Sequence, residues 1–139
     1  MNRFHEKVVL ITGGGSGLGA DAAIHTITAN VAHEEEVSSF VNETVKTFGK
    51  IDAFFNNAGI EGKQNLTEDF GEEEFNRVVS INLNGVFFGM MHVLKVMRKQ
   101  GYGSIVNTAS VGGIRGVGNQ SGYAASKHGV VGLTRNSGK

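Results

Sequence analysis

Short apolar runs, either rich in β-branched residues or alternating with polar ones, occur at four places and predict strands. They cover residues 7–12, 25–31, 51–56 and 103–110. The first run, KVVLIT, is almost continuously apolar and ends at a glycine turn. That pattern is typical of a strand buried on both faces of a sheet.

Between these runs the apolar residues recur at helical spacing. One face of a predicted helix over residues 34–48 carries Val37, Phe40, Val41, Val45 and Phe48, and Gly49 ends it. A longer pattern from Phe75 almost to Gly101 predicts a second helix, and residues 121–135 predict a third. A short helix is also expected over about residues 18–23.

Strands that alternate with helices predict βαβ units and a parallel sheet. We therefore expect an α/β fold with a Rossmann-like, doubly wound sheet of four parallel strands and helices on both faces. Residues 1–139 are expected to form a single dinucleotide-binding domain, although an incomplete one.

The composition argues against several classes of partner and site. Lys and Arg number 13 and Asp and Glu number 13, and this zero net charge argues against nucleic acid or an anionic membrane as the main partner. The absence of Cys excludes a disulfide framework, and the five scattered His residues lack metal-ligand spacing. Residues 1–7 lack a signal-peptide core and no apolar run approaches the roughly 20 residues of a membrane span, so we expect a cytoplasmic protein.

The glycine-rich stretch TGGGSGLG, residues 12–19, lies between the first predicted strand and a predicted helix. Glycines let the backbone approach a pyrophosphate, and a helix N-terminus favours its negative charge. This context predicts a dinucleotide site. A flexible surface loop is the alternative interpretation, which the position after a buried strand disfavours.

Tyr123 and Lys127 lie four residues apart on the predicted last helix and therefore share a face. An ammonium group near a phenol favours the phenolate and lowers the phenol pKa from its usual value near 10. Such a pair can act as an acid/base unit, although it also arises by chance on exposed helices. Ser110 ends the fourth predicted strand, where open α/β sheets bind ligands, so its hydroxyl could hold a carbonyl or simply cap a turn.

Taken together, TGGGSGLG, NNAG at residues 56–59, INLNG around Asn82, Ser110 and YAASK at residues 123–127 resemble the short-chain dehydrogenase/reductase family. The stretches FFNNAGIEGKQN and NTASVGGIRGVGNQSGYAASKHGVVGLTRNS resemble its levodione reductase and cyclic-alcohol dehydrogenase branch. The resemblance implies an oxidoreductase that transfers hydride between a nicotinamide cofactor and a secondary alcohol or ketone. NAD is favoured over NADP because no basic residue stands near Ser16 to hold a 2′-phosphate.

The resemblance also implies residue roles. Tyr123 is the general acid/base, Lys127 lowers its pKa and binds the nicotinamide ribose, and Ser110 holds the substrate oxygen. Asn82 positions a water in a relay to Lys127, although the residues alone favour a helix kink there. The implied cofactor-binding residues are Gly13, Ser16, Gly17, Leu18, Gly19, Asn30, Val31, Asn57, Ala58 and Gly59, together with Tyr123 and Lys127.

The chain departs from the family pattern in two places. Most of the first helix, the second strand and the second helix are missing after Gly19, and with them the acidic residue that binds the adenosine ribose. Asp21 comes too early to replace it, and Asn30 stands where the family usually has Asp. The elements that follow the last helix in the family are also missing, consistent with the zero Pro count, so Val130, Val131 and Leu133 are expected to be exposed.

Two functions from different classes follow. The first is an NAD(P)-dependent dehydrogenase or reductase with a small alcohol or ketone as substrate and no nucleic-acid, membrane or metal partner. The second is a non-catalytic truncated fragment or binding module that needs a partner chain. In either case we expect homo-oligomers or self-association through apolar surface left bare.

Overall fold

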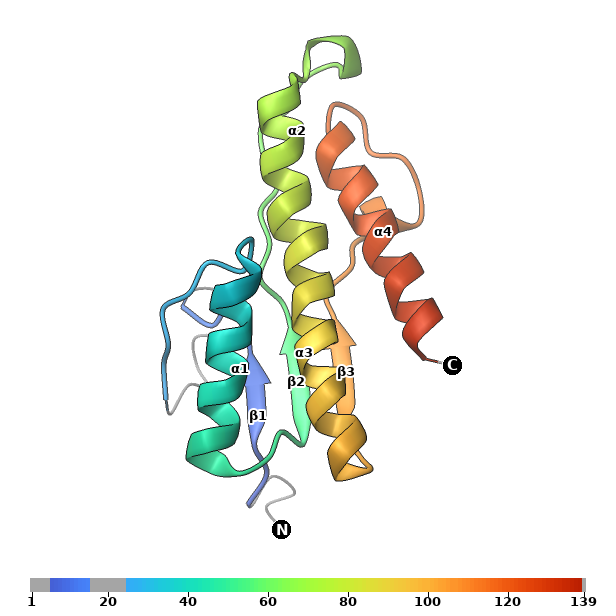
Figure 1. Cartoon of the computed structure of the whole chain (residues 1–139). Coiled ribbons are helices and arrows are strands. Elements are labelled where there is room, and N and C mark those ends of the chain that lie inside the picture. Colours follow the sequence, from blue (N-terminus) through green and yellow to red (C-terminus); the bar gives the residue numbers. More distant parts are fainter. Residues whose placement is uncertain (1–5, 16–24, 139) are drawn as a thin grey trace.

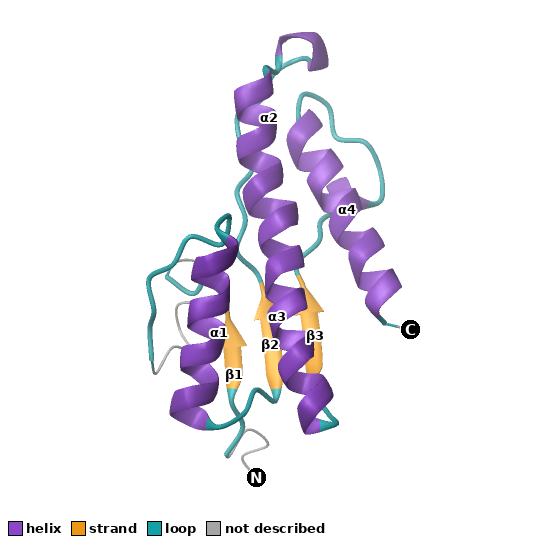
Figure 2. Ribbon diagram, in the orientation of Figure 1, coloured by secondary structure: helices purple, strands orange, loops and turns teal. Residues whose placement is uncertain are grey.

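The computed structural model describes residues 6–15 and 25–138. Three parallel strands form its sheet in the order β1 (Val9–Ile11), β2 (Ala53–Asn56) and β3 (Ser104–Asn107), as Figures 1 and 2 show. Each strand lies inside a predicted run. The parallel α/β class is therefore confirmed, with one strand fewer than predicted.

The helices are α1 (Glu34–Phe48), α2 (Glu72–Val79), α3 (Gly85–Gln100) and α4 (Ser121–Ser137). A π-helical turn, Ser80–Asn84, joins α2 to α3 and makes them one continuous helical stretch. All three predicted helices beyond residue 25 are confirmed, and Gly49 ends α1 in the left-handed conformation at φ 79°. The helix expected at 18–23 lies outside the described residues.

The main core lies between the sheet and the pair α1 and α3. Its buried side chains are Val37, Phe40, Val41, Ile51, Phe54, Val93 and Met97. Burying each such side chain fully is worth about 1.5–3 kcal/mol. A second cluster joins α3 to α4, where Val130 packs against Val86 and Met90. The expectation that Val130, Val131 and Leu133 are exposed is wrong, because Val130 is fully buried in this cluster and the other two are half-buried.

The prediction of helices on both faces of the sheet is also wrong for the described residues. Leu10 and Ile105 point toward the core under α1, α3 and α4, and successive strand residues alternate between faces. On the opposite face Val9 is 43% exposed and Val106 is 57% exposed.

Residues 25–31, predicted as a strand, pair with no strand. His25 contacts Glu43 and Phe48 near the end of α1, and the Asn30 N–H donates a 2.7 Å hydrogen bond to Glu36 near its start. The segment therefore runs along α1, as Figure 1 shows. Its alternating pattern reflects Ala29 and Val31 packing against the core beside this helix rather than a sheet ladder.

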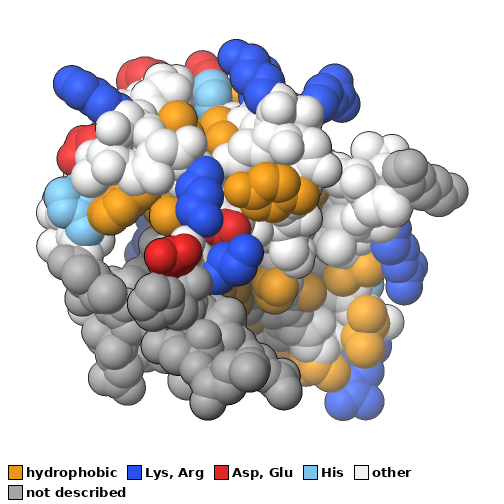
Figure 3. All heavy atoms as spheres, turned by 90° about the horizontal axis from the view of Figure 1, so that it is seen from below, with side chains coloured by type: hydrophobic (Ala, Val, Ile, Leu, Met, Phe, Trp, Pro, Cys, Tyr) orange, Lys and Arg blue, Asp and Glu red, His pale blue; other side chains and the backbone are white. Residues whose placement is uncertain are grey.

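The amino-terminal end of the sheet is held by Asp52. Its carboxylate accepts a 2.8 Å hydrogen bond from Val8 N and pairs at 3.2 Å with Lys7 and with Lys50. The hydrogen bond from Val8 and the two ammonium groups hold the pKa of Asp52 below its usual value. Figure 3, which views this end, shows acidic and basic side chains side by side among scattered hydrophobic ones.

Among the described residues, one helical stretch, Glu72–Gln100, is long and apolar enough to cross a membrane by length and composition. This corrects the expectation that no segment reaches that threshold. Packing accounts for part of its apolar residues, since Val86, Met90, Val93 and Met97 are buried against the sheet, α1 and α4. Phe87 and Leu94 of the same stretch are exposed.

Candidate active site

Thr12 joins the carboxyl ends of β1 and β2. Its hydroxyl oxygen accepts hydrogen bonds from Asn57 N at 3.0 Å and from Ala58 N at 3.1 Å. Gly13 follows with φ 70°, and a Cβ there would lie 2.9 Å from Ala58 Cα. The glycine turn and the turn at residues 57–59 are therefore in contact, as only glycine at position 13 allows. Sequence reasoning missed Thr12, although a hydroxyl at the junction of strand and glycine turn was a usable signal.

The glycine turn is only partly described. Among the described residues, no atom lies within 4 Å of the position that a Cβ on Gly15 would take. The predicted cofactor-binding residues Ser16, Gly17, Leu18 and Gly19 lie outside the described residues.

Asn82 lies in the π turn and is completely buried. Its Oδ1 accepts a 2.8 Å hydrogen bond from Ile60 N, and its Nδ2 donates to Ile60 O at 2.8 Å and to Ser126 Oγ at 3.2 Å. Both amide hydrogens are therefore used within the protein. The side chain fastens the loop after Gly59 to the helical stretch, and π turns recur at functional sites for such irregular roles.

Lys127 is the buried cation of the site, with 4% of its surface exposed. Its Nζ donates a 2.9 Å hydrogen bond to Thr108 O and lies 5.7 Å from the centre of the Tyr123 ring. Burial lowers the pKa of Lys127, because a low-dielectric surrounding disfavours the ammonium form. A Cβ on Gly59 would lie 3.5 Å from this nitrogen and 3.2 Å from Asn82 Oδ1, so Gly59 lies against both side chains.

Ser110 precedes the short 3₁₀ turn Val111–Gly113, and its Oγ accepts a 3.2 Å hydrogen bond from Gly112 N. This is the capping role that the sequence left open as an alternative. Gly112 in turn faces Tyr123, because a Cβ there would lie 3.3 Å from Tyr123 Cε1. The four residues expected to be catalytic are thus linked in space: Ser110 through Gly112 to Tyr123 and Lys127, and Lys127 through Gly59 to Asn82.

Three small residues on one face of α4 bring this helix close to α2 and the π turn. A Cβ on Gly122 would lie 3.2 Å from Phe70 and 3.3 Å from Val78 of α2, and one on Gly129 only 2.7 Å from Leu83. Ser126 lies between them, fully buried, and donates a 2.8 Å hydrogen bond to Tyr123 O. Sequence reasoning missed Ser126, although small residues at 122, 126 and 129 follow helical spacing.

Asn30 and Val31, expected to bind cofactor, take structural roles at the start of α1. Asn30 Oδ1 accepts a 3.0 Å hydrogen bond from Ala32 N, and Val31 packs against the backbone of Gly85. The hydrogen bond from Asn30 N lowers the pKa of Glu36. Within residues 6–15 and 25–138, no three His, Asp or Glu side chains gather closely enough to hold a metal ion.

Known proteins resemble this chain over most of its length. A family model described as short chain dehydrogenase matches residues 19–139. Levodione reductase of Leifsonia aquatica is 54% identical, with 97% of this chain and 64% of the relative covered. Cyclohexanol dehydrogenase of Acinetobacter sp. (strain SE19) is 38% identical, with 96% and 66% covered.

Solved structures give the same result. The crystal structure of levodione reductase superposes with a TM-score of 0.91 at 54% identity, over 95% of this chain and 65% of the other. NAD⁺-bound xylitol dehydrogenase superposes with a TM-score of 0.93 at 32% identity, over 97% and 65%.

The chain spans about two thirds of the length of these relatives. The match to levodione reductase runs over 170 aligned positions, whereas the chain has 139 residues. The relative therefore carries residues inside the matched region that this chain lacks, as the missing segment after Gly19 predicts. The chain belongs to the short-chain dehydrogenase family and has a partial form of its Rossmann-like fold.

Proposed function

We propose that the chain is an NAD(P)-dependent oxidoreductase that interconverts a secondary alcohol and a ketone, with Tyr123 as its acid/base. The observation that carries the proposal is the buried Lys127 ammonium held beside Tyr123 and Gly59. These groups lie beyond the carboxyl ends of three parallel strands, which is where open α/β sheets bind ligands.

The residues present fit a nicotinamide dinucleotide. Gly13 lies against the backbone of Ala58, and Gly59 lies against the side chains of Asn82 and Lys127, so glycines bring the two turns and these side chains together. The glycine turn would hold the pyrophosphate, residues 57–59 would flank the adenosine side, and Lys127 would bond a ribose hydroxyl. When bound, the nicotinamide ring supplies or accepts the hydride.

The cofactor we propose is NAD, with NADP as the alternative. Solved relatives include an NAD⁺-bound xylitol dehydrogenase and an NADP-bound protein named ElxO, which is 30% identical. The stretch around Ser16 contains no Lys or Arg that would select a 2′-phosphate.

Four residues of the chain would have separate roles in proton transfer and in orienting the substrate. During reduction the Tyr123 hydroxyl gives its proton to the carbonyl oxygen, and during oxidation the phenolate takes it back. The Lys127 ammonium stabilises the negative charge left on the Tyr123 oxygen. Ser110 donates a hydrogen bond to the substrate oxygen, and Asn82, through Gly59, fixes where Lys127 lies. We further propose cyclic ketones and alcohols as substrates, because the levodione reductase and cyclohexanol dehydrogenase relatives carry such names.

A second candidate function is a module completed by a partner chain. β3 is an edge strand, and its residue Asn107 has a buried Oδ1 without a hydrogen-bond partner among the described residues. Buried acceptors of this kind are normally satisfied. Separately, the unpaired backbone edge of β3 could take a further strand from a partner chain. Self-association of the chain, in the cytoplasm, belongs to the same proposal.

The deciding experiment combines NADH titration calorimetry with assays of NADH oxidation on cyclic ketones. We expect weak binding and slow turnover, and we expect Tyr123→Phe to lower kcat by roughly 10²–10⁴, the usual contribution of a general acid. Tyr102→Phe, at a half-exposed tyrosine in the turn after α3, is the matched control. It should change neither the NADH affinity nor kcat. Turnover that survives Tyr123→Phe, or the absence of both binding and turnover, would contradict the proposal.

A further inference from the structure

The start of α4 is fixed by contacts to a distant part of the chain. Gln120, the residue before the helix, makes no side-chain hydrogen bond to the first turn. Instead the hydroxyls of Ser121 and Thr67 share a hydrogen bond of 2.9 Å. Two residues earlier, Asn119 O accepts a hydrogen bond of 2.9 Å from Asn65 N. We call these four residues, Asn65, Thr67, Asn119 and Ser121, the helix-start clamp.

The backbone of Asn119 takes an uncommon conformation at the clamp. Its φ of 62° lies in the left-handed region that few residues other than glycine adopt. Asn is among the side chains that tolerate this region best, which suits the residue found here. The conformation is held in place by the contacts on either side of it, one to Asn65 and one to Thr67 through Ser121.

The other half of the clamp is anchored to α2. Glu74 accepts a 2.7 Å hydrogen bond from Lys63 N and pairs with Arg77 at 2.8 Å. The Arg77 guanidinium and the Lys63 N–H lower the pKa of Glu74 to about 2. Because α2 continues directly into the π turn, the segment that carries Thr67 has a fixed position relative to Asn82.

Tyr123 lies two residues beyond the clamp, in closely packed surroundings. Gly122 presses on Phe70 on one side, and the Tyr123 ring lies against Gly112 on the other. Any movement of the helix start would therefore move the Tyr123 ring. Proton and hydride transfer require reacting atoms held at about 3–3.5 Å, so a small displacement is costly.

We propose that Thr67 and Ser121 are positioning residues, whose shared hydrogen bond sets where Tyr123 lies in the active site. The role rests on the proposed function, in which Tyr123 is the acid/base. Neither hydroxyl needs to touch the substrate, because both act through the start of α4. Loss of either should leave ground-state binding intact and weaken only the transition state.

The test uses Tyr123 as its own reporter. The chain has two tyrosines and no Trp, so a Tyr102→Phe background makes Tyr123 the only strong emitter. In that background Thr67→Val and Ser121→Ala should each increase acrylamide quenching of Tyr123 fluorescence in the folded protein. The double variant should match either single one, since both remove the same bond. Thr67→Ser and Ser121→Thr should restore the original value, and Thr47→Val and Ser39→Ala, exposed on α1, are the controls.

Steady-state assays provide the second readout. Each clamp variant should lower kcat by roughly 2- to 10-fold, the equivalent of one hydrogen bond, with KM for the ketone unchanged. Quenching and kcat equal to the controls, with only a lower melting temperature, would overturn the positioning role. A rise in KM alone would also overturn it. If NADH neither binds nor reacts, the proposed function fails, while the quenching comparison still decides whether the clamp holds Tyr123.

Discussion

The two halves of the proposed cofactor site differ in how completely they are built. On the side of Tyr123 and Lys127, Asn82 connects three separate segments by hydrogen bonds, and glycines at 59 and 112 allow close contacts. On the adenosine side, residues 25–31 lie along α1 and Asn30 is used in a local turn. The proposed catalytic half is held by packing of the described helices against one another. In the proposed adenosine half, residues 25–31 pair with no strand of the described sheet.

The largest loss of stability is expected from Asn82→Ala, because Asn82 makes the hydrogen bonds that join the segments of the proposed catalytic half. The substitution removes three hydrogen bonds at a fully buried position. It leaves Ile60 N and Ile60 O without these partners, while Ser126 keeps only its bond to Tyr123 O. Each buried group left unsatisfied costs about 1–3 kcal/mol, so we expect a loss of about 2–4 kcal/mol in the free energy of unfolding. Urea denaturation followed by circular dichroism measures it.

Asn84→Ala is the matched control, since Asn84 lies exposed in the same π turn. Its effect should stay within about 0.5 kcal/mol. Equal losses in the two variants would mean that Asn82 is not the centre of the catalytic half.

A smaller effect is expected at the junction between the two halves. Gly13→Ala places a Cβ 2.9 Å from the Ala58 backbone and forces Ala to φ 70°. We expect a loss of roughly 2–3 kcal/mol, because a left-handed residue alone costs about 1–2 kcal/mol and the backbone contact must also shift. Gly15→Ala, where a Cβ would meet no atom of the described residues within 4 Å, should change stability by less than about 1 kcal/mol. The same urea experiment compares them, and similar losses would contradict the close contact at Gly13.

The contrast between the halves also explains what the sequence could predict. Apolar periodicity located α1, the long helix and α4, because each buries one continuous stripe against the sheet or a neighbouring helix. The motif around Tyr123 and Lys127 predicted a shared helix face, which fixed spacing alone guarantees. The strand predicted over residues 25–31 is wrong, because apolar and polar residues alternate in the same way in a segment that packs on a helix and in one that pairs in a sheet. The π turn at Asn82 and its bond to Ser126 left no trace in the apolar pattern, since both are buried polar contacts between distant segments.

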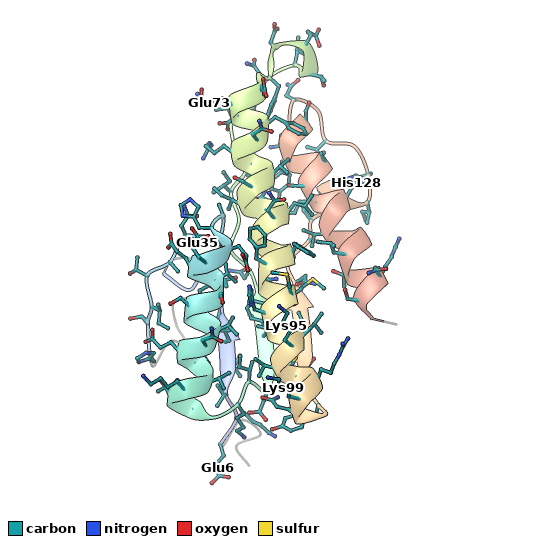
Figure 4. All side chains as sticks on the ribbon, in the orientation of Figure 1. Glu6, Glu35, Glu73, Lys95, Lys99 and His128 are labelled. Carbon is teal, nitrogen blue, oxygen red and sulfur yellow. The ribbon has the colours of Figure 1, made fainter. Side chains whose placement is uncertain are left out.

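The smallest effect is expected from Asn30→Asp, which gives the adenosine half a carboxylate where the family usually has one. Asp can keep the hydrogen bond from Ala32 N, and the site is exposed, so stability should change by less than about 0.5 kcal/mol. A carboxylate in a prebuilt ribose or adenine site would form a charge-assisted hydrogen bond and tighten NADH binding by tenfold or more. Because residues 25–31 are not held in the sheet, we expect Asn30→Asp to raise the NADH affinity measured by calorimetry by less than tenfold. Asn42→Asp, at an exposed position on α1, is the control for the added negative charge. This helix already carries exposed acidic side chains such as Glu35, which Figure 4 labels at its start. A gain above tenfold that Asn42→Asp does not reproduce would show that the adenosine half is as well prepared as the catalytic half.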